Sequence, residues 1–118
     1  MVLRASAELA GLNLDFRALV DRGVSIGSAD GDLLLLLVDA IAGDDDARLG
    51  LVQRQVIDTL GPEALCSAAA VTANFSRNDR IANGIGIPLE REFVQQGEAL
   101  RALLGIDEFL SARNTLGR

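Results

Sequence analysis

The chain has 118 residues, of which 49% are hydrophobic and 24% charged, and its formal net charge is −6. This composition indicates one globular domain covering residues 1–118 and excludes a disordered chain, because it supplies enough apolar surface for a core. The acidic balance argues against nucleic acid and anionic membranes as partners, since both need clustered positive charge. Leu and Ala dominate the apolar residues, which favours helices over strands.

The first half of the chain predicts four helices. Asp15 is a cap for the second helix and Gly23 ends it, while Ser28 and the acids that follow begin the third. In the fourth helix, apolar residues recur at steps of three and four and form one stripe. The predicted ranges are 3–12, 15–22, 28–42 and 44–60.

The second half predicts three more helices. Gly61 ends the fourth helix, and Pro62 occupies the favoured first position of the fifth. Pro88 begins a sixth helix with inward-facing apolar residues, and a short last helix folds back across the others. The predicted ranges are 62–84, 88–104 and 107–113, so we expect an all-α, compact helical bundle of about six to seven helices.

Two of these helices suggest self-association. The helix 28–42 is apolar on nearly every face, and such a helix is usually buried. A bundle of this size can bury it centrally, or a second copy can cover it. The helix 62–84 also has a face of small residues around Ala69 and Ala73, which another helix can approach closely. We therefore expect a homo-oligomer.

A polar cluster in the helix 62–84 supplies the candidate pocket or binding residues. They are Asn74, Arg77, Asn78, Asp79 and Arg80. At 100° per residue, Asn78 falls on the same face as Phe75 and Ala82, so we expect it on the core side, either as a structural hydrogen-bonding residue or as the polar floor of a pocket. Arg77 and Arg80 either bind a small anionic ligand or form solvated pairs with Asp79 and nearby acids.

Other polar features have structural interpretations. Cys66 lacks a second Cys or an orienting His, so we expect a buried small hydrophobic residue. The acidic runs 30–32 and 44–46 fit helix starts and do not follow calcium-loop spacing, so no metal site is expected. The segment 84–86 ends a helix and does not follow a strand, which excludes a dinucleotide loop. We expect no cofactor.

No segment of the sequence predicts membrane insertion. The longest apolar run, 33–38, has six residues, whereas a spanning helix needs roughly 20. The N-terminal stretch 1–14 is interrupted by polar residues and lacks the apolar core of a signal peptide. We therefore expect a cytoplasmic protein.

The helix 62–84 and the turn after it carry a family resemblance. The letters that match are Phe75, Arg80, Ile81, Ala82, Gly86, Ile87, Pro88 and Leu89. This pattern resembles the C-terminal helix of the carboxymuconolactone decarboxylase and alkylhydroperoxidase-like superfamily, and the segments 104–109 and 111–115 look like tails seen on such proteins. The resemblance implies an oligomeric helical fold. The family's C-x-x-C pair and His are missing here, so thiol peroxidase activity is not expected.

Three functions remain open from the sequence. The first is a non-redox helical oligomer of this superfamily's fold with a binding or accessory role. The second is a cofactor-free enzyme that acts on a small organic acid or lactone, with Arg77 or Arg80 holding the anion and an acid moving the proton. The third is a protein-interaction module with an exposed apolar patch around Leu34, Leu35 and Val38.

Overall fold

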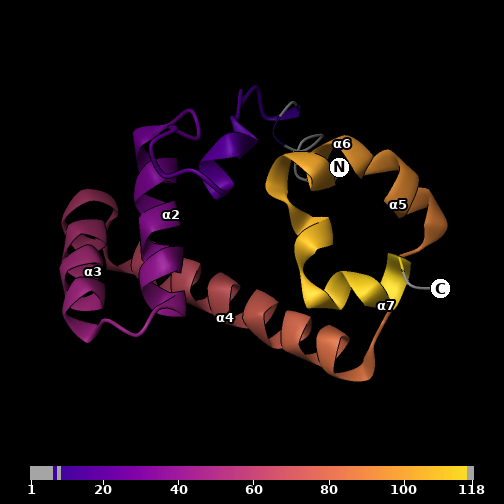
Figure 1. Cartoon of the computed structure of the whole chain (residues 1–118). Coiled ribbons are helices and arrows are strands. Elements are labelled where there is room, and N and C mark those ends of the chain that lie inside the picture. Colours follow the sequence, from indigo (N-terminus) through magenta and orange to yellow (C-terminus); the bar gives the residue numbers. More distant parts are fainter. Residues whose placement is uncertain (1–6, 8, 117–118) are drawn as a thin grey trace.

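The computed structural model describes residue 7 and residues 9–116, and within them every regular element is helical. Six α-helices and three short 3₁₀ helices follow one another along the chain (Figure 1). The helices pack together, so the predicted all-α bundle is confirmed. Half of the predicted helix 3–12 lies outside the described residues; of the other half, residues 7 and 9 are helical, and the chain has left the helix by residue 12. The elements are η1 (Phe16–Leu19), α2 (Ala29–Ala42), α3 (Asp46–Leu60), α4 (Pro62–Ile85), α5 (Arg91–Gln96), α6 (Glu98–Leu104), η2 (Ile106–Glu108), η3 (Leu110–Ala112) and α7 (Arg113–Leu116).

The pair α2 and α3 holds most of the core. The Ser28 hydroxyl accepts a hydrogen bond from the Gly31 backbone N–H, and the Asp45 carboxylate accepts one from the Arg48 N–H, so both helices begin where the sequence predicts. Their facing residues form one apolar cluster, in which Leu37 and Val56 are fully buried. The buried members of the cluster are Leu33, Leu37, Ala40, Val52 and Val56.

Helix α4 is the longest element. It begins at Pro62 after Gly61, which has a φ of 91°, and ends at Gly86, which takes the left-handed conformation with a φ of 68°. At 1.5 Å per residue its 24 residues extend for about 36 Å. Its first part packs on α3 and α2, and its far end leads to the C-terminal elements (Figure 1). None of its residues is buried.

The C-terminal elements form a separate lobe that curves back on itself (Figure 1). The predicted helix 88–104 is wrong as one element, because Gly97 divides it into α5 and α6. Gly97 has ψ near 2°, so the helical path bends there, while its N–H still donates to the Phe93 carbonyl oxygen. The predicted helix 107–113 is likewise replaced by η2, η3 and α7.

The segment before α2 is less helical than its sequence predicts. The expected helix 15–22 is a single 3₁₀ turn, η1. It begins after the Asp15 cap, as predicted, but it already ends at Val20. Ala18 from this turn is fully buried. In the described part of the chain, no helix is both long and apolar enough to cross a membrane.

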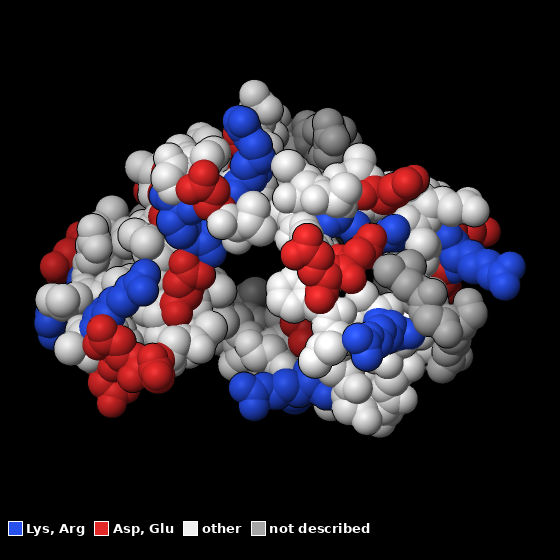
Figure 2. All heavy atoms as spheres, in the orientation of Figure 1, with Lys and Arg blue, Asp and Glu red and all other residues white. Residues whose placement is uncertain are grey.

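The two lobes leave a hollow between them. Figure 2 shows this hollow between α2 with η1 on one side and the C-terminal lobe on the other. The radius of gyration is 15.8 Å, and the molecule measures 47 × 33 × 24 Å. A compact domain of this length has a radius of gyration of about 13.5 Å. The chain is therefore more open than a single closed core would make it.

Candidate functional site

The predicted polar cluster lies along the outside of α4. All five of its side chains are exposed to solvent: Asn74, Arg77, Asn78, Asp79 and Arg80. The Arg77 guanidinium donates a hydrogen bond of 2.8 Å to the Asn74 amide oxygen and one of 3.4 Å to that of Asn78. The cluster is thus a local arrangement on one helix, and its members line none of the four cavities described below.

The expectation that Asn78 faces the protomer's core is wrong. Asn78 does share a helical face with Val71, Phe75 and Ile85, but all four are exposed. Ala82, on the same face, is half-buried and lines the cavity of the C-terminal lobe. The Phe75 side chain is 63% exposed, although a Phe of a single-chain core is usually buried. The helical projection identified residues that share a face, and that face is turned to solvent.

Cys66 is also exposed, so the expectation of a buried small residue is wrong. It lies in the second turn of α4, where Leu65 and Ala68, rather than Cys66, pack against the α2–α3 core.

The acidic runs lie at helix starts, as the sequence predicts: Asp30 and Asp32 are in the first turn of α2, and Asp45 caps α3. Asp32 also accepts hydrogen bonds from the Ser25 hydroxyl and the Ile26 N–H, which the sequence did not predict. The Ser25 bond, followed by the Ile26 bond, lowers the pKa of Asp32.

Two ion pairs hold the segment before α2 in place. Arg22 binds both carboxylate oxygens of Asp39 at 2.5 and 2.7 Å, which fastens the segment before α2 onto that helix. Hydrogen bonds from Arg22 lower the pKa of Asp39. Beside η1, the Arg17 side chain and its backbone N–H both donate to Asp15 and lower the pKa of that carboxyl to about 2. These pairs stabilise local structure.

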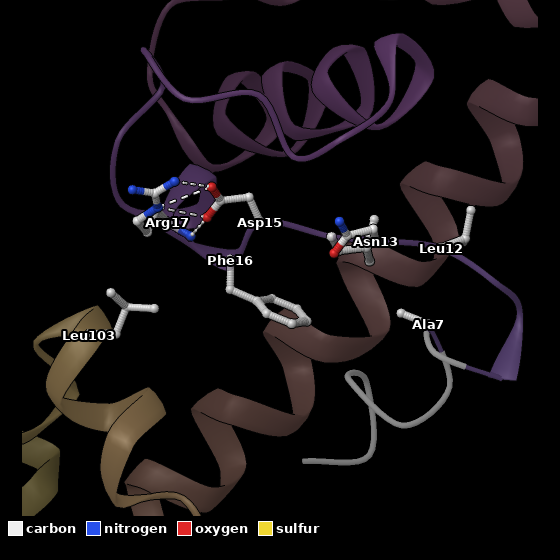
Figure 3. Close-up of a pocket in the computed structure, with 8 residues that line it drawn as sticks. Ala7, Leu12, Asn13, Asp15, Phe16, Arg17 and Leu103 are labelled. Carbon is white, nitrogen blue, oxygen red and sulfur yellow. Dashed lines mark hydrogen bonds and ion pairs between the residues drawn. The ribbon is translucent and has the colours of Figure 1, made fainter.

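A cavity of about 380 Å³ lies between the segment before η1 and helix α6. Figure 3 shows Phe16, the first residue of η1, extending toward the space in front of α4, with Leu103 of α6 on the other side. The Asp15–Arg17 pair forms its polar edge, and both charges already satisfy one another. A smaller concavity of about 250 Å³ lies beside Arg22 and Leu35.

An apolar groove runs between α2 and α4, with a volume of about 460 Å³. Leu34 and Val38 form one wall, and Val71 lies on the opposite wall. This groove contains two of the three residues at which the sequence predicted an exposed apolar patch. Its lining is Leu34, Val38, Leu60, Ala64, Ser67, Ala68, Val71 and Thr72.

A fourth cavity, of about 310 Å³, lies inside the C-terminal lobe. The last turn of α4, the turn 87–89 and the elements α5 to α7 surround it. Arg101 and Asn114, two of its polar residues, are not among the candidate residues that the sequence predicts. The sequence offers no clear signal for Arg101, because the helical face it shares with Val94 also carries Glu98.

Comparisons with family models, curated proteins and solved structures found no match to this chain. The resemblance to the carboxymuconolactone decarboxylase and alkylhydroperoxidase-like superfamily therefore stays a prediction. The described residues contain no group of three or more Cys, Asp or Glu side chains arranged to hold a metal ion.

Proposed function

We propose that this protein is a non-redox, homo-oligomeric helical protein of the cytoplasm with a binding or accessory role. The observation that carries this proposal is the uncovered apolar face of α4, which continues into the groove beside Leu34 and Val38. Large apolar side chains on a continuous surface of this kind mark an interaction site.

The exposed area supports a second copy as the occupant of that surface. A folded monomer of 12.4 kDa is expected to expose about 6,100 Å², whereas this chain exposes 8705 Å². The difference of about 2,600 Å² exceeds the roughly 800 Å² that each partner buries in a stable complex. Association that covers this face of α4 and the groove beside it would reduce the excess.

A two-fold arrangement fits the shape of the surface. In such a pair each copy presents the same patch, so a projecting residue and the groove that receives it occur on both partners. Phe75 projects one helical turn beyond Val71, which lies on the wall of the groove. We place Phe75 of each copy against the groove of the other.

The test is a single charged substitution. Phe75→Glu puts a carboxylate into the proposed contact, where burial without a partner is unfavourable. Burial of one Phe side chain contributes roughly 1.5–3 kcal/mol, and a two-fold pair loses two of them, so the dissociation constant should rise at least 100-fold. Sedimentation velocity at micromolar concentration should show the variant shifted to monomer.

The control is Leu51→Glu on α3. Leu51 is 62% exposed, which matches Phe75, but it lines neither the groove nor the face of α4. The control should sediment like the unchanged protein. If Leu51→Glu dissociates the assembly as strongly as Phe75→Glu, or if neither variant has an effect, the α4 surface is not the contact.

A further inference from the structure

The cavity in the C-terminal lobe has walls that are fixed by contacts between distant residues. The Leu89 backbone N–H donates a 2.7 Å hydrogen bond to the Thr115 hydroxyl, which joins the turn after α4 to α7. Arg101 donates to the Asp107 carboxylate at 2.9 Å and to the Val94 carbonyl oxygen, so it links α5, α6 and η2. The Arg101 side chain is only 15% exposed. The cavity is therefore already formed without a ligand.

The lining is mainly apolar, with a few polar groups that converge on it. Ile87, Leu89 and Phe109 are large apolar residues that remain about half exposed or more, so an apolar ligand would remove them from water. Asn83 and Asn114 contribute side-chain amides, each of which can both donate and accept. An apolar cavity with a few placed polar groups is typical of small-molecule sites, and 310 Å³ lies at the lower end of their usual size.

The charges in the lining favour an uncharged ligand. Arg101 and Asp107 are the charged residues among the described lining, and they neutralise one another at 2.9 Å. An anion would have to compete with Asp107 for the guanidinium and lose its own hydration. A neutral hydroxyl or carbonyl group instead finds a partner in the amide of Asn114, which lines the cavity and can both donate and accept a hydrogen bond.

We propose that this cavity binds a small, uncharged molecule with an apolar body and one alcohol or carbonyl group. The inference names the ligand class of the binding role proposed above, but it does not require self-association, because one chain supplies the whole lining. The site differs from the arginine pair on α4 that the sequence suggested for an anion.

The experiment uses the full chain and the uncharged fluorescent probe N-phenyl-1-naphthylamine, whose emission rises in apolar surroundings. The chain has no Trp or Tyr to interfere. Ala112→Phe places a ring into the cavity and should weaken probe binding at least tenfold, whereas Ala99→Phe, at an exposed position of α6 outside the lining, should not change it. Circular dichroism checks that each variant is folded. Unchanged probe affinity in folded Ala112→Phe overturns the proposal.

Competition identifies the ligand class. 1-Octanol should displace the probe at a concentration at least tenfold lower than octanoate, which has the same chain length and a negative charge. Asn114→Leu should weaken 1-octanol about fivefold through the loss of one hydrogen bond and leave the probe affinity unchanged. This variant keeps the test decisive if Ala112→Phe does not fold. Equal or stronger displacement by octanoate overturns the assignment of an uncharged ligand.

The proposed oligomer can be tested separately from the cavity. Phe75→Glu should keep the probe affinity even where it dissociates the assembly, because Phe75 does not line the cavity. Loss of probe binding in this variant places the probe between two copies and overturns the cavity proposal.

Discussion

Leu37→Ala tests whether the contact between α2 and α3 is the centre of the fold. Leu37 is fully buried against Val56, and half-buried neighbours such as Leu36 and Leu49 surround this pair. Deletion of a buried Leu side chain costs 2–5 kcal/mol through the lost transfer free energy and the cavity that remains. Because the half-buried neighbours can relax into the space, we expect a loss of about 3 kcal/mol, which lowers the Tm by roughly 12 °C.

The assay is urea unfolding followed by circular dichroism at 222 nm, at one fixed protein concentration so that association does not change the comparison. The control is Leu51→Ala, which shortens an exposed Leu of α3 and should change the free energy of unfolding by less than about 0.5 kcal/mol. A loss below about 1 kcal/mol for Leu37→Ala, or equal losses for the two variants, would refute this description of the core.

Two further predictions concern the ion pair of α2 and the end of α4. Hydrogen bonds from Arg22 lower the pKa of Asp39 below 3.8, so the stability they contribute is present above that pH and is lost as the pH falls through the folded-state pKa. With side chains 35% and 31% exposed, the pair contributes less than about 1 kcal/mol. Asp39→Asn should lower the urea midpoint at pH 7, and this difference should shrink as the pH falls below the usual pKa range of Asp. A difference that persists at low pH contradicts the assignment. Gly86→Ala should destabilise by about 1 kcal/mol because its φ is 68°, whereas Gly84→Ala, in open helical surroundings two residues earlier, should stabilise by roughly 0.5 kcal/mol. Thermal melts that shift in the same direction for both glycine variants would argue against the left-handed cap.

Local signals in the sequence predicted the three longest helices well. The expected ranges 28–42, 44–60 and 62–84 differ from α2, α3 and α4 by at most two residues at either end, because caps and Gly–Pro stops act on neighbouring backbone atoms. The split at Gly97 was missed because the apolar pattern continues across it. Its conformation depends on how the C-terminal lobe closes, which local sequence does not specify.

The candidate site was predicted less well, for a related reason. Helical projection places Phe75 and Asn78 on one face, but it does not tell whether the protomer itself covers that face. The described residues leave both exposed, so the face inferred to be core is a surface. The cavity beside Arg101 and Asn114 combines residues from elements that meet only after folding. Contacts between elements that lie far apart along the chain are difficult to predict from a single sequence.

The most direct test of the proposed self-association is native mass spectrometry of the unmodified protein at micromolar concentration. The account predicts a discrete homo-oligomer, because the protomer exposes about 2,600 Å² more than a monomer of its mass should. A spectrum that contains only the 12.4 kDa monomer at micromolar concentration would contradict the proposed self-association.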